Sequence, residues 1–427
     1  MLNKKSFLIP AQKNPVIYLI FIIAAAIVSL PMKAAPLVEI SGKVKNVKNK
    51  KVIPNVSVSV AGTNISTVTN DDGFFLLKIP ESKTGNGLKI EQLGFQTKNL
   101  SGKELTPDKE LTVFLEPSGK VLKEVFVLGG DPKEIVEEAL KKIPVNYADN
   151  ENLFSGFYRE TIQKGSRFVN ISEAVVDVLK KPYSRRNIQG EKVGIHRGRS
   201  IISPNPKDTL AVKLMGGPFM PVMLDAVKNG DHLFEIEEIN NFDFKMEQGA
   251  LIDDRMHYVI SFKPKVSLHY PLNSGTFFID GEDLTISRVE FSLDMKDKGK
   301  ATRSILQKKP SGLNFKPLEV SGVVTYRNID GKAYINYISS KIRFKCDWKK
   351  RLFSSTYTTF AEMVMVDRVE SPDKSQKIKD SFGNRKIFSD YVEKYWDEDF
   401  WKDYNIIEPT ESLEKAVEKL YNKSAIH

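Results

Sequence analysis

A run of short, alternating strands between Val38 and Leu115 constrains the fold more than any other feature of the chain. Val56, Val58 and Val60 alternate with small residues, which is the pattern of a strand with one buried face. A turn follows at residues 70–73 (Asn-Asp-Asp-Gly), since Asx residues and glycine tolerate left-handed backbone. Strands this short, at this spacing, predict a small antiparallel β-sandwich.

The same stretch resembles a known family. The resemblance is carried, in chain order, by residues 40–44 (Ile-Ser-Gly-Lys-Val), 53–58 (Ile-Pro-Asn-Val-Ser-Val), 67–75 (Thr-Val-Thr-Asn-Asp-Asp-Gly-Phe-Phe), Ile79-Pro80 and Gly94-Phe95. Together they are similar to the carboxypeptidase regulatory-like (prealbumin-like) domain. The resemblance implies a non-catalytic sandwich in an envelope protein of a Gram-negative bacterium. It therefore informs on fold and compartment more than on activity.

Residues 1–35 have the pattern of a secretory signal peptide. Lys4 and Lys5 precede an apolar run from Val16 to Leu30, which is short for a membrane span, and Lys33-Ala34-Ala35 is the cleavage region. An uncleaved anchor is the alternative. No later run is long and apolar enough to predict a transmembrane helix after signal removal. We expect an exported protein, in the periplasm or at the inner face of the outer membrane.

The charge and cysteine content limit the classes of partner. The formal net charge is +10, and removing the four lysines of residues 1–35 leaves +6. A positive charge of this size can be explained by solubility alone. Nucleic acid is not expected as a partner of an exported chain. Cys346 is the only cysteine, so no intrachain disulfide can form. It shares a strand face with Ile342, Phe344 and Trp348 and is predicted to be buried.

Beyond the sandwich (residues 36–118), residues 119–150 predict a linker strand and a capped helix. Asp131 is the expected N-cap, Pro132 the first helical residue, and Glu134 stands three residues after the cap. Residues 122–125, 146–147 and 156–160 look like a group of envelope proteins that carry the same front module. That group has no activity that could be carried over.

Residues 151–384 predict a large antiparallel sheet domain. Alternation is strong at residues 256–262, 276–280 and 333–348, so one face of each strand is buried and the other wet, as in a curved antiparallel sheet. We expect about eight strands, and loops or short helices between 180 and 250. The hairpins within residues 258–290 are similar to those of periplasmic lipoprotein carriers. Residues 385–427 predict a C-terminal helical segment, and the whole chain is mainly β with α.

A basic stretch is the strongest candidate surface site. Its glycines and Pro182 predict a loop, and only Glu191 opposes its positive charge. It could hold an anionic ligand such as lipid phosphate or an acidic glycan, although a solvated loop is the simpler interpretation. The residues are Lys180, Lys181, Arg185, Arg186, Lys192, Arg197 and Arg199.

Patterns for catalysis are weak. His232 and Glu235 match half of a carboxypeptidase zinc site, but His257 and His269 follow too closely to supply the third ligand. The turn at Asp71-Asp72-Gly73 could ligate calcium, but turn chemistry explains these residues more simply. The chain has no H-E-x-x-H, G-x-S-x-G or phosphate-cradling glycine motif. We therefore predict no metal, no cofactor and no enzymatic activity.

The sequence predicts an exported, non-enzymatic cell-envelope protein with a binding or assembly role. Its partner would be an outer-membrane protein, a lipid or a glycan. One alternative is a periplasmic lipid or lipoprotein carrier that uses the curved sheet. Another is a metal-dependent hydrolase, which would require His232, Glu235 and a third ligand to converge.

Overall fold

The computed structural model describes residues 36–107, 109–118, 129–208, 210–233, 235–349, 354–373, 376–383, 386–396 and 404–424. The predicted signal peptide (1–35), the predicted strand at 121–128 and the aromatic residues Phe400 and Trp401 lie outside these ranges. The chain from Leu37 onward forms one compact unit. Across the ranges given, no helix has the length and apolar character that crossing a membrane requires.

The first part of this unit is a β-sandwich, as predicted, but it is not antiparallel throughout, because its first and last strands pair in parallel. Its two sheets have the strand orders β4-β1-β7 and β3-β2-β5-β6. Its core is made by buried side chains that include Val56, Val58 and Phe75. The strands are β1 (Leu37–Asn46), β2 (Ser57–Val60), β3 (Ser66–Val68), β4 (Phe74–Pro80), β5 (Leu88–Glu91), β6 (Lys98–Leu100) and β7 (Leu111–Leu115), with 3-10 turns η1 (Glu81–Asn86) and η2 (Gly102–Glu104).

The Asn70–Gly73 turn forms for the reason that the sequence suggests. The Asn70 side-chain oxygen accepts hydrogen bonds from the backbone N–H groups of Asp72 and Phe74, both at 3.0 Å. Gly73 has a φ of 69°, and a Cβ at this position would lie 2.8 Å from the Cβ of Val52. Glycine is therefore required both by the backbone angle and by the close approach of a neighbouring strand.

The predicted capped helix is α2 (Pro132–Lys141). The carboxylate of Asp131 accepts from the backbone N–H of Lys133 at 2.8 Å and of Glu134 at 3.3 Å, which satisfies two of the unpaired donors at the helix start. The helix ends before Pro144, and a second short helix, α3 (Ile143–Asn146), follows. Proline is tolerated there because it stands in the first turn of α3.

The largest element is an antiparallel sheet of eleven strands, ordered β10-β9-β8-β20-β19-β18-β16-β15-β14-β12 with β13 beside β14. The early strand β8 pairs with the late strand β20, so residues about two hundred positions apart become neighbours. The strands are β8 (Asn152–Lys164), β9 (Arg167–Lys180), β10 (Lys192–Ile202), β12 (Phe242–Met246), β13 (Ala250–Ile252), β14 (Arg255–Pro264), β15 (Asn273–Asp280), β16 (Ile286–Leu293), β18 (Leu313–Ile329), β19 (Lys332–Trp348) and β20 (Ser355–Glu370).

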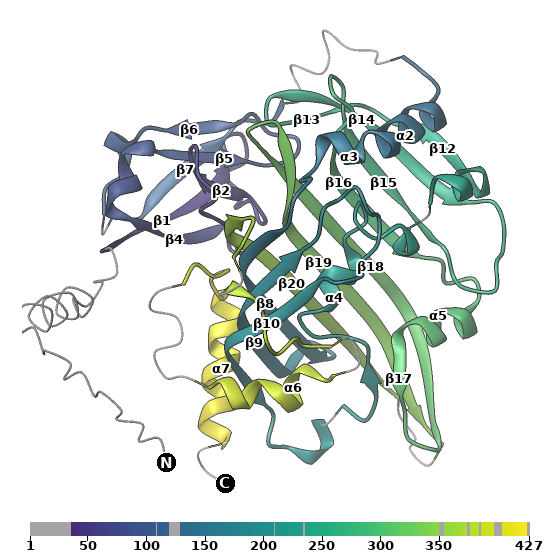
Figure 1. Cartoon of the computed structure of the whole chain (residues 1–427). Coiled ribbons are helices and arrows are strands. Elements are labelled where there is room, and N and C mark those ends of the chain that lie inside the picture. The colour runs from purple at the N-terminus through teal and green to yellow at the C-terminus, as the bar shows by residue number, and fades with distance from the viewer. Residues whose placement is uncertain are drawn as a thin grey trace, which may run out of the picture. The chain divides into compact units, whose positions relative to one another are not determined.

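The two faces of this sheet are covered differently. Short helices cover one face and share a single apolar core with the strands, to which Tyr158, Ile260 and Ile338 contribute. On the other face, helix α7 packs on β9 and β10 (Figure 1), and Val68 of the sandwich contacts Phe157 and other side chains of the central strands. The remaining elements are α4 (Met220–Leu224), α5 (Lys298–Ile305), α6 (Phe388–Tyr391), α7 (Glu411–Ser424), β11 (Lys213–Leu214), β17 (Leu306–Lys308), η4 (Pro206–Asp208), η5 (Gly230–His232), η6 (Ile236–Asn241) and η8 (Val392–Tyr395).

Two predictions about this sheet are wrong. It has eleven strands rather than about eight, because several short strands give little alternation. The basic stretch is not a loop throughout, since Lys192–Ile202 is strand β10. Gly194 and Gly198, which predict a loop in the sequence, lie within the strand and allow the C-terminal segment to approach closely: a Cβ on Gly198 would lie 2.2 Å from Cγ2 of Val392.

Candidate functional site

A cavity of about 140 Å³, lined by both polar and apolar groups, lies where the sandwich meets the open face of the large sheet. We call it the junction cavity. The sandwich lines it with residues of β2, β5 and the loop after β5, and the sheet with residues of β14 to β16, β18 and β19. The lining residues that carry the argument below are Ser57, Glu91, Arg255, His257, Ser287 and Arg327.

The hairpin between β13 and β14 holds the sandwich at one side of the junction cavity. Asp253 and Asp254 both have positive φ, at 51° and 56°, as a two-residue hairpin turn requires. The carboxylate of Asp253 pairs with the ammonium of Lys89 at 2.5 Å, and the carboxylate of Asp254 accepts from the backbone N–H of Thr97 at 3.0 Å. The turn therefore presents two carboxylates to the sandwich.

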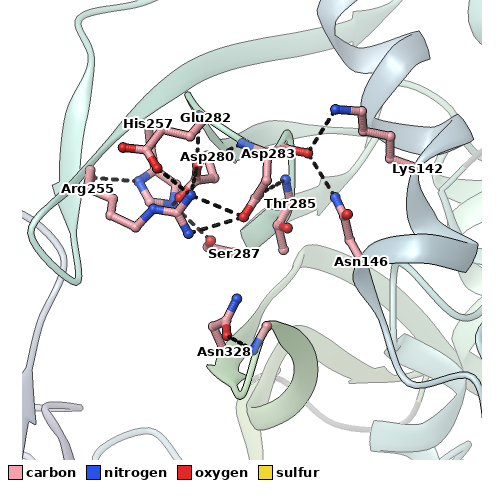
Figure 2. A network of polar contacts seen from close by, with 11 residues as sticks. Lys142, Asn146, Arg255, His257, Asp280, Glu282, Asp283, Thr285, Ser287 and Asn328 are labelled. Carbon is pink, nitrogen blue, oxygen red and sulfur yellow. Dashed lines mark hydrogen bonds and ion pairs between the residues drawn. The ribbon is translucent and has the colours of Figure 1, made fainter.

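The first polar wall of the junction cavity is built around the guanidinium of Arg255. Its Nη2 atom lies 2.8 Å from a carboxylate oxygen of Asp280, 3.0 Å from Glu282 and 3.1 Å from Asp283. Lys142 and Asn146 reach the same turn from the end of α2 and from α3, and both donate to the backbone carbonyl of Asp283 (Figure 2). The charge of Arg255 is thus matched by neighbouring carboxylates.

His257 stands beside this network and is almost fully buried, with 1% of its surface exposed. Its Nδ1 atom lies 2.9 Å from the carbonyl oxygen of Arg255, so Nδ1 carries the proton. Its Nε2 atom lies 2.8 Å from Oγ of Ser287 and accepts the serine O–H. Burial lowers the pKa of His257, which is consistent with a neutral imidazole.

A serine held by a histidine is also one requirement of nucleophilic catalysis. In a hydrolase triad, a carboxylate would accept the proton of Nδ1. Here a backbone carbonyl takes that position, and the carboxylate of Asp280 lies 3.9 Å from Nε2 instead. The arrangement satisfies a buried histidine and lacks the third member of a triad.

Two residues that line the junction cavity each have a buried polar atom without a hydrogen-bond partner among the described residues: Oγ of Ser57 and Nη1 of Arg327. They come from opposite sides, Ser57 from the sandwich and Arg327 from β18. The other end of the Arg327 guanidinium donates from Nη2 to the carbonyl of Asn64 at 3.0 Å. A buried polar atom without a partner costs about 1–3 kcal/mol, so a polar ligand that reached either atom would recover a hydrogen bond.

Glu91 adds a titratable carboxyl to the same cavity. Burial is the main cause that raises its pKa to about 7, and the negative charge of Asp253 adds to the effect. Lys89 opposes the shift, with its ammonium 2.9 Å from Glu91 and 2.5 Å from Asp253. One ammonium thus stands between two carboxylates, and Glu91 is the one that holds a proton near neutral pH.

The structure separates the seven residues of the predicted basic site. Lys180 is buried, and its ammonium lies 2.8 Å from carboxylates of both Glu191 and Asp225. Burial alone would lower the pKa of Lys180, but these two carboxylates outweigh it and raise the pKa. The hydroxyl of Tyr183 also donates to Asp225, at 2.8 Å. This lysine joins the core rather than a ligand-binding surface.

Three more of the seven have carboxylate partners. Lys181 pairs with Glu151, Arg186 with Glu235 at 2.8 Å, and Arg199 with Glu173 at 2.7 Å. Arg185 and Lys192 are exposed, and the guanidinium of Arg197 lies 5.9 Å from the ring of Tyr404. An anionic-ligand site on this stretch stays a prediction. The positive charge of the stretch is largely compensated by carboxylates of the protein itself.

The other singled-out residues take part in packing or hydrogen bonding, although Nε2 of His232 has no hydrogen-bond partner in the part of the chain that the structure describes. His232 is buried with its ring 4.5 Å from that of Phe291, and burial lowers the pKa of His232 to about 4. Among the described residues, no group of three or more His, Cys, Asp or Glu side chains could hold a metal ion. Asp72 accepts from the backbone N–H of Glu411 at 2.8 Å. Cys346 is 3% exposed, as predicted, and burial raises its pKa to about 11.

The junction cavity is not predicted by the sequence. A weak sequence signal is nevertheless present. Arg255 and His257 are polar residues two positions apart on one strand, and Thr325 and Arg327 are two positions apart on another. The sequence alone predicts only that such residues lie on a solvent-exposed face. Alternation shows that such residues share a face. It does not show that a separate domain covers them, and that cover is what turns a wet face into a cavity.

Three solved structures align with just over half of the chain, at low identity and with TM-scores of 0.25 or less. A protein domain from Vibrio parahaemolyticus, assigned by its name to outer membrane lipoprotein sorting, aligns at 12% identity and a TM-score of 0.25 over 57% of this chain and 94% of its own. A DUF1329 family protein from Desulfovibrio piger aligns at 9% and 0.25, over 56% and 94%. A LolA superfamily protein from Nitrosomonas europaea aligns at 11% and 0.19, over 56% and 95%.

No curated protein matches the chain. One family model does match, that of the CarboxypepD_reg-like domain, and it covers residues 40–127. The match falls on the sandwich and on the residues that carry the resemblance in the sequence. Residues 40–127 are therefore a CarboxypepD_reg-like domain, joined in this chain to a large antiparallel sheet.

Proposed function

We propose that this protein is an exported, non-enzymatic binding protein of the cell envelope. In this proposal it holds a small polar ligand between its CarboxypepD_reg-like domain and its large sheet. The observation that carries the proposal is the pair of buried atoms without a partner in the described ranges, Oγ of Ser57 and Nη1 of Arg327, whose residues line one cavity from two sides. A ligand that accepts from both would recover the hydrogen bonds that the protein leaves unmade.

The charge of the cavity indicates what kind of group would bind. Arg255 pairs with Asp280, and Arg288 pairs with Glu290 at 2.8 Å. Arg327, by contrast, has no carboxylate within ion-pair distance among the described residues. A guanidinium in this state favours a carboxylate or phosphate oxygen, to which it can donate two parallel hydrogen bonds.

The compartment is part of the proposal. The apolar run from Val16 to Leu30, after Lys4 and Lys5, supports export, and a CarboxypepD_reg-like domain is compatible with an envelope protein. A periplasmic location, or one at the inner face of the outer membrane, would place the cavity where envelope components are available. An outer-membrane protein, a lipid or a glycan then remain the partners to test.

Native mass spectrometry of the protein purified from an envelope fraction tests the proposal. We expect a bound mass on the wild-type protein that is absent from Arg327→Gln and reduced in Ser57→Ala. The matched control is Arg303→Gln, since Arg303 is an exposed arginine on α5, outside the junction cavity. A wild-type protein with no bound mass, or one that Arg327→Gln retains in full, contradicts the proposal.

A lipid or lipoprotein carrier is the second candidate. The observation in its favour is the single apolar core that the short helices share with one face of an eleven-stranded sheet. Movement of these helices away from the sheet would expose apolar surface to an acyl chain. In the described conformation, buried aromatic side chains such as Tyr147, Tyr158 and Tyr183 fill that core. Organic extraction of the purified protein tests this candidate, and recovery of one lipid per chain would favour it over the polar ligand.

A further inference from the structure

A second, larger cavity continues from the junction cavity along the same face of the sheet. It has a volume of about 550 Å³ and crosses strands β15, β16, β18, β19 and β20. We call it the hydroxyl groove. Val323 and Ser339 line both cavities, so the hydroxyl groove opens directly beside the junction cavity.

The strand register explains why one kind of side chain collects in the hydroxyl groove. Residues directly opposite each other on neighbouring strands point to the same face. One cross-strand row consists of Ser274, Ser292, Ser321, Lys341 and Phe360, each paired with the next and all lining the groove.

A second row lies two residues nearer to the sandwich, and a third row belongs to the junction cavity. The second consists of Thr276, Glu290, Val323 and Ser339. The third contains Arg288, Thr325 and Tyr337, which line the junction cavity. From Ser321 to Arg327 along β18, the surface extends about 20 Å at the usual rise of a strand.

This lining excludes two classes of elongated ligand. An acyl chain would remove the serine and threonine hydroxyls from water without giving them hydrogen bonds, which is unfavourable. A peptide that adds a strand needs the free edge of a sheet, whereas the groove lies on the face of central strands. Hydroxyls that both donate and accept, beside the ring of Phe360, instead match the hydroxyls and the apolar ring faces of sugars.

We propose, building on the ligand-binding function above, that the ligand is an acidic oligosaccharide. Its carboxylate lies in the junction cavity, where Nη1 of Arg327 and Oγ of Ser57 donate to it. Its neutral sugar rings continue along the hydroxyl groove towards Phe360. The juxtaposition of an arginine that has no direct ion pair among the described residues with a row of hydroxyls carries this inference.

Calorimetric titration with a tetrasaccharide of three galactose units that ends in one galacturonic acid, and with the matching neutral galactose tetramer, tests the inference. We expect the wild-type protein to bind the acidic tetramer at least about tenfold more tightly than the neutral one. Arg327→Gln removes this preference, and Arg303→Gln retains it. Phe360→Ala weakens binding of both tetramers, whereas Phe114→Ala, at an exposed phenylalanine on the other sheet of the sandwich, leaves both unchanged.

The two proposals can fail separately. If native mass spectrometry finds a bound mass that depends on Arg327 but neither tetramer binds, the saccharide inference is overturned and the binding function stands. If the neutral tetramer binds the wild-type protein as tightly as the acidic one, the role of Arg327 as the anion site is overturned. If no mass is retained and no tetramer binds, both proposals are overturned.

Discussion

The Nε atom of Arg159 donates to a carboxylate oxygen of Glu173 at 2.7 Å, and the two side chains are only 4% and 1% exposed. Arg199 donates to the other oxygen of Glu173, also at 2.7 Å, and Nη2 of Arg159 donates to the carbonyl of Ile407 at 2.7 Å. Burial alone would raise the pKa of Glu173, but Arg159 and Arg199 outweigh it and lower the pKa. The ion cluster therefore joins three strands to the C-terminal segment.

Replacing Arg159 should destabilise the protein strongly. Arg159→Met leaves Glu173 and Glu362 buried with less compensation, and breaking a buried ion pair from one side typically costs about 3–5 kcal/mol. Urea denaturation measures the free energy of unfolding, and Arg303→Met, on the surface of α5, is the control. A loss below about 1 kcal/mol for Arg159→Met would show that the cluster contributes little.

This cluster also shows where prediction from sequence ends. The strands that contain Arg159, Glu173 and Glu362 could be predicted, because alternation is a local property of the chain. The contact between these three side chains could not be predicted, because it depends on the pairing of β8 with β20, which lie at opposite ends of the sheet domain in the sequence. The junction cavity could not be predicted for the same reason, because Ser57 and Arg327 line one cavity only when the sandwich docks on the sheet.

The glycines show that one residue type can have two structural roles, of which only one can be predicted from the local sequence. The same residue type marks a true turn at Gly73, where φ is 69°, and a close packing contact at Gly198 in the middle of β10. The sequence around Gly73 contains Asx residues that specify the turn, so that prediction succeeded. The partner of Gly198 is Val392, almost two hundred residues later, and nothing local to Gly198 distinguishes the two cases.

Asn405 should be required for the docking of the sandwich edge. Its Oδ1 atom accepts from the backbone N–H of Lys78 at 2.6 Å, and its Nδ2 atom donates to the Lys78 carbonyl at 3.1 Å. The side chain thus completes the free edge of β4. Asn405→Ala loses both bonds, with an expected cost of about 1–3 kcal/mol. Hydrogen exchange of residues 74–80 should accelerate in this variant and not in Asn99→Ala, at an exposed position of β6; equal exchange in both would contradict the prediction.

His232 should make the protein sensitive to acid. Its pKa is about 4 in the folded protein, mainly because burial disfavours the imidazolium, and is near 6.5 when unfolded. The unfolded chain therefore binds the proton first as the pH falls, so stability is lost between pH 6.5 and 4. Between pH 7 and pH 5 we expect a loss of about 2 kcal/mol from this residue. His232→Phe, which cannot titrate, should show a smaller difference between urea midpoints at these two pH values, and an unchanged difference would disprove the assignment.

Glu91 should have the opposite effect, so that the stability of the folded protein decreases as the pH rises. Burial raises its pKa from 4.5 to about 7, so the folded protein binds the proton more tightly than the unfolded chain. Its contribution to stability is complete below pH 4.5 and declines as the pH rises through 7, by about 1 kcal/mol between pH 6 and 8. Glu91→Gln mimics the protonated carboxyl and should remove this decline in urea denaturation.

The charges that face Glu91 extend the prediction to ligand binding. They are Asp253 and Lys89 at the hairpin contact and Arg327 across the junction cavity. Burial lowers the pKa of Arg327, and the negative charge of Glu91 opposes this shift. Protonation of Glu91 removes a negative charge that competes with an anionic ligand for Arg327. The acidic tetramer should therefore bind more tightly at pH 6 than at pH 8, and Glu91→Gln should bind it equally at both. Because Arg327 stays charged throughout this range, weaker binding at pH 6 would mean that the anion does not lie against Arg327.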